Sequence, residues 1–283
     1  MSTSNLAILG CGNIGSAIAK GLAKSGLTPA DITLTRRKLE SLSELNQVGF
    51  QTSDDNAKAV QNSEIIFLTV GPSELMDFLD EISSSLNADH LLISIVSGVS
   101  IAKIQAKVGT EISIVRAMPN TAATLCESMT CLSSLPQFAQ GLKTAQSLFD
   151  KVGNTLEIDE TQMASATALC ACGVAFFLRA IRAASQGGIE IGFHSDEAFT
   201  IAAQTARGAA TLLLDNHTHP EAEIDQVTTP MGATIATLLD HKWIPVAQHR
   251  LVHPTKDKFL DLDDVTCGEH LIRNEFRGCY PWL

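Results

Sequence analysis

A glycine-rich loop between a predicted strand and a predicted helix constrains the fold of this chain most strongly. The apolar run Leu6–Leu9 enters the loop, which reads Gly10-Cys11-Gly12-Asn13-Ile14-Gly15, and an amphipathic helix follows it. Such a loop after a buried strand predicts a βαβ unit whose loop residues bind a dinucleotide. The first glycine allows a tight turn, the second lets backbone approach a pyrophosphate, and the third lets helix pack on strand. The alternative is a glycine-rich turn in an unrelated α/β fold.

The second predicted strand, 32–35, lacks the acidic residue that NAD-selective sites place at its end. Thr35, Arg36 and Arg37 occupy that place. Two guanidinium groups and a hydroxyl suit a 2′-phosphate, because arginine offers a planar fork to phosphate oxygens. The alternative is a solvated basic turn before a helix that starts near Leu39. The sequence therefore predicts NADPH as the cofactor, with NADH also allowed.

Composition narrows the class of protein. The 283 residues are 45% hydrophobic and 18% charged, as in ordinary soluble globular proteins. The formal net charge of −11 argues against nucleic acid as a partner. The seven cysteines show neither a disulfide-framework spacing nor a zinc-ligand spacing, which indicates a reducing compartment and no metal site. The N-terminal residues lead directly into the first strand, so we expect no signal peptide and a cytoplasmic location.

The most apolar stretch of the chain is Ala164–Ile191. Arg179, Arg182 and Gln186 interrupt it. These polar side chains predict a buried helix of a soluble protein rather than a membrane span, so we expect no membrane partner.

Strand and helix signals alternate through the first half of the chain. Further apolar strands are predicted at 65–70, 90–95 and 112–116. Between them we expect a helix from about Ser73, capped by that serine, to Ser84, and another from Ser100 onward. Near-continuous apolar strands separated by helices predict a parallel sheet that is covered on both faces.

The pattern becomes helical alone from about Met163 onward. The predicted architecture is therefore α/β. A Rossmann-type, doubly wound N-terminal domain spans 1–159, and an all-helical C-terminal domain spans 160–242.

Two further segments carry a resemblance to a known family. Residues 114–121 read I-V-R-A-M-P-N-T, which is similar to the R-x-M-P-N-T segment of pyrroline-5-carboxylate reductases. Residues 225–236 read D-Q-V-T-T-P-M-G-A-T-I-A, which is similar to that family's D-x-V-T-S-P-G-G-T-T-I-x signature. The glycine loop and the segments 188–193 and 202–205 also match the family, and all of these segments occur in the family's order. The chain therefore resembles this family over about residues 5–238.

The resemblance implies an oxidoreductase of proline biosynthesis, which transfers a hydride from NADPH to the imine carbon of 1-pyrroline-5-carboxylate to give L-proline. A protonated imine is already electrophilic, so we assign no catalytic acid or base, and the protein has only to hold two reactants face to face. The resemblance also implies that the helical domain is a dimerisation domain, so the expected partners are a small-molecule substrate and a second copy, as a homodimer or higher homo-oligomer.

Four residues are expected to bind the substrate. Ala233 and Thr234 open a predicted helix whose N–H groups can receive the substrate carboxylate, the alternative being a plain helix N-terminus capped by Thr229. Glu160 looks like a family position that faces the product, the alternative being a solvated residue at a helix start. Cys172 stands where the family usually has serine, and its thiol is a weaker donor.

Further cofactor contacts are expected at the carboxyl ends of the strands, where ligands bind in open α/β sheets. The residues at these ends are Thr69, Val70, Gly71, Pro72, Ile95, Val96 and Ser97. The resemblance adds Asn56, which contacts the cofactor ribose in the family, and Gln226, which lies near the nicotinamide half. Without the resemblance, Asp55-Asn56 would simply cap a helix.

Two other functions stay open. The first is a related imine or β-hydroxyacid reductase. That class usually needs a catalytic lysine in the long interdomain helix, and the stretch Ala164–Ile191 contains none. The second is a catalytically impaired NADPH-binding homologue. The residues that keep it open are Cys172, Val174 and Met231, the last of which stands where the family has glycine.

The resemblance ends near Leu238. Leu239–Pro245 breaks the helical pattern with which the family finishes, and Pro254 interrupts it again. Residues 243–283 are therefore predicted to form an atypical tail that packs poorly after about Lys242, arising either from a change of reading frame or from a divergent extension.

Overall fold

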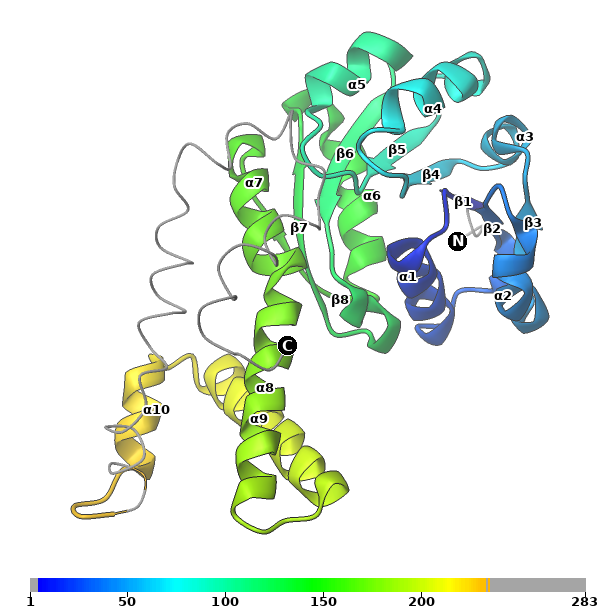
Figure 1. Ribbon diagram of the computed structural model, residues 1–283. Coiled ribbons are helices and arrows are strands. Elements are labelled where there is room, and N and C mark those ends of the chain that lie inside the picture. Colours follow the sequence, from blue (N-terminus) through cyan, green and yellow to red (C-terminus); the bar gives the residue numbers. More distant parts are fainter. Residues whose placement is uncertain (1–4, 233, 235–283) are drawn as a thin grey trace. The chain divides into compact units, whose positions relative to one another are not determined.

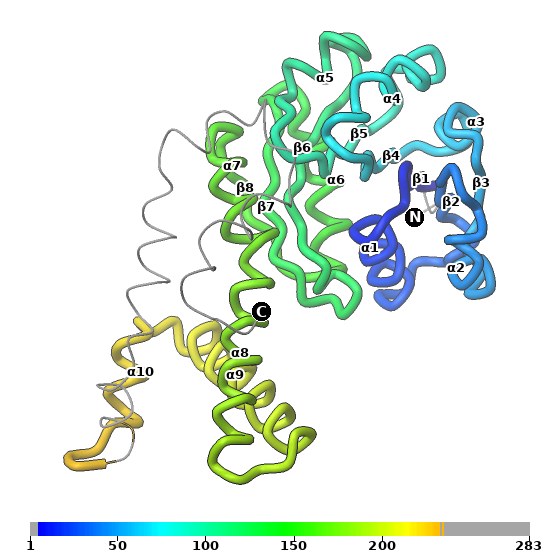
Figure 2. The backbone as a smooth tube through the Cα atoms, viewed as in Figure 1, coloured from blue at the N-terminus to red at the C-terminus, as the bar shows by residue number. Residues whose placement is uncertain are grey.

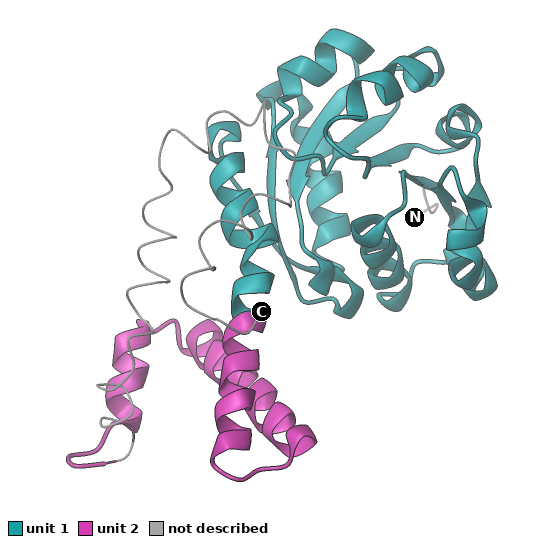
Figure 3. Cartoon of the chain, viewed as in Figure 1, with its two compact units in different colours: residues 1–177 teal, residues 178–283 magenta. Residues whose placement is uncertain are grey.

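The computed structural model of the chain describes residues 5–232 and residue 234 (Figure 1). The chain divides into two compact units, which are residues 1–177 and residues 178–283 (Figure 3). The dividing point falls within the long helix α8, Gly173–Glu190. The predicted domain limits at 159 and 242 remain predictions, and the predicted tail, 243–283, lies outside the described residues.

The first unit is built on one sheet, which in the described residues has the strand order β3-β2-β1-β4-β5-β6-β7-β8. The strands are β1 (Leu6–Leu9), β2 (Ile32–Thr35), β3 (Gln51–Ser53), β4 (Ile65–Leu68), β5 (Leu91–Ser94), β6 (Ser113–Met118), β7 (Ser128–Ser134) and β8 (Gly153–Glu157). The colour gradient along the backbone tube runs across the sheet, from the blue strands β1–β3 at one edge to the green strands β7 and β8 at the other (Figure 2). The predicted Rossmann-type, doubly wound fold is confirmed.

Both faces of the sheet are buried at its centre, which is why β1 and β4 are apolar throughout. Along β1, Ile8 belongs to one hydrophobic core, and Ala7 and Leu9 belong to a second core on the opposite face, since successive side chains of a strand alternate. The first core includes residues of α1 (Asn13–Lys24), α2 (Ser43–Val48) and α6 (Ala139–Phe149), and the second includes residues of α3 (Asn56–Gln61), α4 (Leu75–Ile82) and α5 (Ile101–Val108).

Two predicted helix starts have different outcomes. The helix predicted from Ser100 onward is α5, and Ser100 caps it, because its side chain accepts a hydrogen bond from the Lys103 N–H. The helix predicted from about Ser73 is α4, which begins at Leu75, so the predicted cap at Ser73 is wrong. The Glu74 N–H donates to the Gly71 carbonyl at 3.0 Å, so residues 71–74 form a turn that delays the helix.

The sheet continues beyond the predicted strands. The strand β7 pairs antiparallel with β6, and β8 pairs parallel with β7 at the edge. Neither strand was predicted, because serine, threonine and asparagine interrupt their apolar residues. The first unit therefore has a mainly parallel sheet with one antiparallel pairing.

The helical run that follows the sheet contains an irregular turn. Residues of α7 (Met163–Ala166) continue through a π-helical turn, Thr167–Ala171, into α8. Cys170 in this turn packs with Met163, Met118 and Cys131 in a third, smaller core. The Sγ atoms of Cys131 and Cys170 are 3.4 Å apart, and both thiols are free.

In its described residues the second unit is helical, as predicted. After α8 it contains α9 (Ser195–Asn216) and α10 (Pro220–Val227). The expectation that the 164–191 helix is buried is wrong for the single chain, because Gly173 is the only buried residue that the structure describes in α8. The run Glu160–Glu190 is long and apolar enough to cross a membrane by length and composition, with 17% of its most apolar window buried, but one such helix is weak evidence for a membrane protein.

Candidate functional site

The glycine loop forms a cradle at the carboxyl end of β1. Gly10 has φ +74°, and a Cβ atom there would lie 2.4 Å from Val70 Cγ1. At Gly15 a Cβ would lie 2.8 Å from Thr69 Oγ1. A Cβ at Gly12 would meet only the Gly10 carbonyl oxygen, at 3.8 Å. The protein itself therefore requires glycine at the outer two positions, whereas the space beside Gly12 is open.

Among the described residues, no side chain accepts a hydrogen bond from the first N–H groups of α1. Gly12 caps the helix without a side-chain hydrogen bond, and no acidic residue lies in the first turn. Asn13 is exposed and Ile14 is half-buried, while Cys11 points into the core. A helix N-terminus with free N–H groups and a partial positive charge suits a phosphate.

The Cys11 side chain is buried beneath the glycine loop and packs in the core. Its Sγ atom lies 3.5 Å from Ser16 Oγ, and burial raises the pKa of this thiol above its ordinary value. The thiol therefore stays neutral at physiological pH and contributes packing, and the loop presents only backbone to a ligand on its open side.

Thr35 joins the end of β2 to the glycine loop. The Gly10 N–H donates to Thr35 Oγ1 at 3.3 Å, and the Cys11 N–H donates to the Thr35 carbonyl at 2.8 Å. Thr35 Oγ1 in turn donates to Asn56 Oδ1 at 2.6 Å. The side chain of Thr35 is fully buried, so its role is to hold the loop and Asn56 together.

The two arginines that follow β2 are exposed but differ in their partners. Arg37 forms an ion pair with Glu74, and the two side chains are 88% and 51% exposed. Within the described residues, the Arg36 side chain makes no hydrogen bond or ion pair, although its charge helps to lower the pKa of Cys11 against the larger effect of burial.

Asn56 begins α3 directly after its cap, Asp55, whose side chain accepts a hydrogen bond from the Lys58 N–H. Asn56 Nδ2 donates to Glu81 Oε1 at 2.9 Å. Glu81, in the last turn of α4, and Glu74, just before that helix, thus both contact predicted cofactor residues. Sequence reasoning missed both acids.

The remaining predicted cofactor residues of the first unit lie at two neighbouring strand ends. Thr69 follows β4, and both its N–H and its hydroxyl donate to the Leu9 carbonyl of β1, at 2.9 and 2.8 Å. Val70 and Gly71 are half-buried and Pro72 is exposed. Ile95 and Ser97 are half-buried after β5, and Val96 is buried. Since β4 lies beside β1 and β5 lies beside β4, the structure brings these residues to the same edge as the glycine loop.

Glu160 lies against β6 and α5. Its Oε1 atom accepts hydrogen bonds from the Ile101 N–H at 2.7 Å and from Arg116 Nη1 at 3.1 Å. The Arg116 side chain is 8% exposed and that of Glu160 is 30% exposed. Within the described residues Oε2 makes no hydrogen bond. Glu160 therefore neutralises the buried guanidinium of Arg116 and holds the start of α5 through Oε1. Its Oε2 atom stays available to accept a hydrogen bond.

Two residues of the R-x-M-P-N-T segment have structural roles that the sequence analysis did not assign. Arg116 is the ion-pair partner of Glu160. Asn120 is buried, and its Nδ2 donates to the Cys170 carbonyl at 3.2 Å, which helps to fix the π-helical turn. The motif itself was the signal that could have found them. Cys172 follows that turn and is exposed.

The last predicted site residues belong to the second unit. Gln226 is exposed on α10, and Thr234 is half-buried in a helical conformation. Met231, three residues before Thr234, is exposed and has φ +58°, a left-handed conformation that favours glycine. Ala233 lies outside the described residues.

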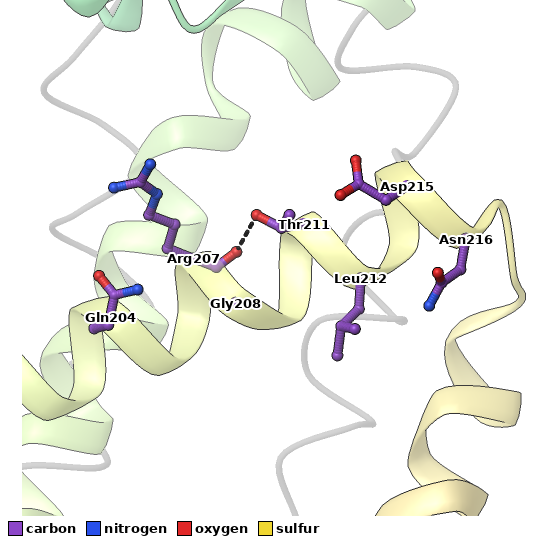
Figure 4. Close-up of a pocket in the computed structure, with 7 residues that line it drawn as sticks. All are labelled: Gln204, Arg207, Gly208, Thr211, Leu212, Asp215 and Asn216. Atoms are coloured by element: carbon purple, nitrogen blue, oxygen red, sulfur yellow. Dashed lines mark hydrogen bonds between the residues drawn. The ribbon is translucent and has the colours of Figure 1, made fainter.

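A shallow hollow lies along one side of α9 (Figure 4). The residues that line it are Gln204, Arg207, Gly208, Thr211, Leu212, Asp215 and Asn216. They all come from this one helix, and Thr211 Oγ1 donates to the Arg207 carbonyl at 2.9 Å. The hollow lacks the convergent polar groups from several elements that are typical of a small-molecule site.

The mainly parallel sheet, the glycine cradle and the uncapped helix N-terminus define a protein of the class that binds dinucleotides on a Rossmann-type domain. Among the described residues, no group of three or more metal-ligating side chains is present.

Comparison with known proteins identifies the family. The family model described as pyrroline-5-carboxylate reductase dimerisation matches residues 160–243, and the one described as NADP oxidoreductase, coenzyme F420-dependent, matches residues 5–98. Pyrroline-5-carboxylate reductase 2 of Dictyostelium discoideum is 43% identical, over 84% of this chain and 85% of that protein. The chain therefore belongs to the pyrroline-5-carboxylate reductase family.

Other similar proteins carry the same family name. Pyrroline-5-carboxylate reductase 1 of Dictyostelium discoideum is 45% identical over 92% of this chain, which spans 50% of the length of that relative. Among solved structures, the pyrroline-5-carboxylate reductase of Coxiella burnetii has a TM-score of 0.75 and 26% identity, and covers 92% of this chain and 94% of its own. The NADP-bound pyrroline carboxylate reductase of Plasmodium falciparum has a TM-score of 0.80 and 24% identity, with coverage of 89% and 94%.

Proposed function

We propose that this chain reduces 1-pyrroline-5-carboxylate to L-proline, with NADPH as the preferred hydride donor and NADH as a second one. Membership of the family, shown by the relative with 43% identity, carries this proposal. The open space beside Gly12 supports a bound dinucleotide. When bound, the reduced nicotinamide supplies the hydride and the protein supplies position and surroundings.

In this proposal the cofactor is held by the edge of the sheet. The N–H groups of α1 bind the pyrophosphate, Arg36 and Arg37 pair with the 2′-phosphate, and Asn56 binds the ribose. The strand ends around Thr69 and Ser97 line the path of the dinucleotide.

The substrate is held by its carboxylate and its ring. Ala233 and Thr234 offer N–H groups and a hydroxyl to the carboxylate. Glu160, with Oε2 available, and Cys172 face the ring, and Gln226 lies near the nicotinamide. These residues orient the imine carbon toward the hydride donor, and a protonated imine needs no further acid.

We also propose that the active form is a homodimer or a higher homo-oligomer located in the cytoplasm. Large apolar side chains are exposed on α8 and α9, among them Phe177 at 70% and Phe199 at 60%. Such a surface is typical of a protein interface, and the dimerisation family model spans both helices. A second copy would cover the hollow on α9 as well.

The direct test is oxidation of NADPH, followed at 340 nm, with 1-pyrroline-5-carboxylate as the substrate and proline identified as the product. We expect turnover that requires both reactants. Binding of NADPH without turnover would instead support a catalytically impaired homologue.

Gly12→Ala tests the proposed cofactor contact. A Cβ at this position has room in the protein itself, so the variant should fold with unchanged thermal stability. It should bind NADPH at least tenfold more weakly, because the methyl group occupies the space that we assign to the pyrophosphate. Unchanged NADPH affinity would contradict this placement.

Light scattering at micromolar concentration tests the proposed assembly. A purely monomeric protein would contradict the proposed homo-oligomer.

A further inference from the structure

The ion pair between Arg37 and Glu74 crosses the carboxyl edge of the sheet. Arg37 comes shortly after β2, and Glu74 follows β4 and precedes α4. The strands β2 and β4 are the two neighbours of β1, whose carboxyl end carries the glycine loop. The pair therefore joins the two loops that flank the glycine loop.

We propose that Glu74 is a specificity-determining residue for the cofactor, because its carboxylate competes with a 2′-phosphate for the Arg37 guanidinium. This inference rests on the proposed use of NADPH at the glycine loop.

The competition follows from the chemistry of the two anions. A guanidinium presents its N–H groups in a planar fork, which suits either a carboxylate or a phosphate. Arg37 must loosen its pair with Glu74 before it can pair fully with a phosphate. An exposed ion pair is weak, so a more highly charged phosphate can displace it, at some loss of affinity. A ribose 2′-hydroxyl carries no charge, so Glu74 should hardly change the binding of NADH.

Arg36 and Arg37 therefore differ in how readily each can pair with a 2′-phosphate. The Arg36 side chain makes no ion pair or hydrogen bond in the part of the chain that the structure describes, whereas Arg37 is held by a carboxylate. Asn56 is likewise held by Glu81. Acids at the start and in the last turn of α4 thus restrain two of the predicted adenosine-side contacts. The consequence is a smaller preference for NADPH over NADH than two unrestrained arginines would give.

The test is calorimetric binding of two fragments to the full chain without cofactor. The fragment 2′,5′-ADP carries the 2′-phosphate, and 5′-AMP lacks it. We expect Glu74→Gln to raise the affinity for 2′,5′-ADP about two- to fivefold, as for release of an exposed ion pair. Its affinity for 5′-AMP should stay unchanged. Asp77→Asn is the matched control, because Asp77 is exposed on α4 and makes no ion pair within the described residues.

Arg37→Ser shows whether Glu74 acts through Arg37. In that background Glu74→Gln should give no gain in affinity for 2′,5′-ADP. An equal gain with and without Arg37, an equal gain from Asp77→Asn, or no gain at all would overturn the inference while leaving the cofactor assignment intact. If 5′-AMP binds but 2′,5′-ADP binds to neither the wild type nor Glu74→Gln, the proposed NADPH preference fails, and the inference fails with it.

Discussion

The ion pair between Arg116 and Glu160 should contribute measurably to the stability of the first unit. Glu160→Ala removes the acceptor of two hydrogen bonds, from Arg116 Nη1 at 3.1 Å and from the Ile101 N–H at 2.7 Å. Arg116 is then left as a charge on a side chain that is 8% exposed. The variant should therefore be less stable than the wild type.

The size of the loss follows from the burial of the two partners. Removing one partner of a buried ion pair costs about 3–5 kcal/mol. Since the Glu160 side chain is 30% exposed, water can reach the pair, and we expect about 2–3 kcal/mol. For a chain of this size, each kcal/mol lowers Tm by about 2–4 °C, so Tm should fall by about 4–12 °C.

Differential scanning calorimetry at a fixed protein concentration measures this effect. Glu157→Ala is the control, because that side chain is exposed on the edge strand, and its Tm should stay within about 2 °C of the wild type. Adding Arg116→Met to Glu160→Ala should restore most of the loss, because the uncompensated charge is removed. A Glu160→Ala variant as stable as the control, or a double variant no more stable than Glu160→Ala, would refute the reasoning.

Three further predictions concern single residues. Met231→Gly should raise the free energy of unfolding by about 1 kcal/mol in urea denaturation, because it relieves a left-handed conformation; a lower stability would contradict this. Thr234→Ala should lower kcat/KM for 1-pyrroline-5-carboxylate about tenfold or more with the KM for NADPH unchanged, because a hydrogen bond to a charged group is worth about 1.5–3 kcal/mol; unchanged substrate kinetics would oppose the proposed site. Burial raises the pKa of Cys131 from 9.0 to about 12. The unfolded chain therefore loses this proton at lower pH than the folded chain, and stability should fall as pH rises from about 9 toward 12. Cys131→Ala should weaken that pH dependence in urea unfolding, and an identical slope in both proteins would count against it.

Local sequence signals predicted the parts of the fold that depend on backbone geometry. Gly10 and Gly15 were identified because their positions admit no Cβ, and the structure shows the atoms that a Cβ would meet. The helix that begins at Ser100 was predicted from its start signal, and in the structure the serine hydroxyl satisfies one nearby N–H. The signal at Ser73 was similar, but the turn that includes Gly71 delayed the helix there.

Other features depend on contacts that a local pattern does not contain. Glu74 contacts Arg37 after β2 and Glu81 contacts Asn56 at the start of α3, and nothing near either acid in the sequence indicates those partners. The strand β8 lies at an edge of the sheet and carries polar residues, so it lacks the apolar run of a central strand. The burial predicted for α8 failed because its composition reflects a surface that the single chain does not cover, which a second copy would cover in the proposed assembly.

The hydroxyl of Thr35 fixes the direction of a chain of hydrogen bonds. A hydroxyl has one proton, and here Asn56 Oδ1 receives it, so Thr35 can meet the Gly10 N–H only as an acceptor. With its carbonyl oxygen turned inward, Asn56 presents its amide N–H groups on the other side, where Glu81 now accepts. Any ligand that takes the place of Glu81 must therefore bring an oxygen lone pair rather than a proton. Thr35→Val would free the amide to turn over, and the same asparagine could then accept where it now donates.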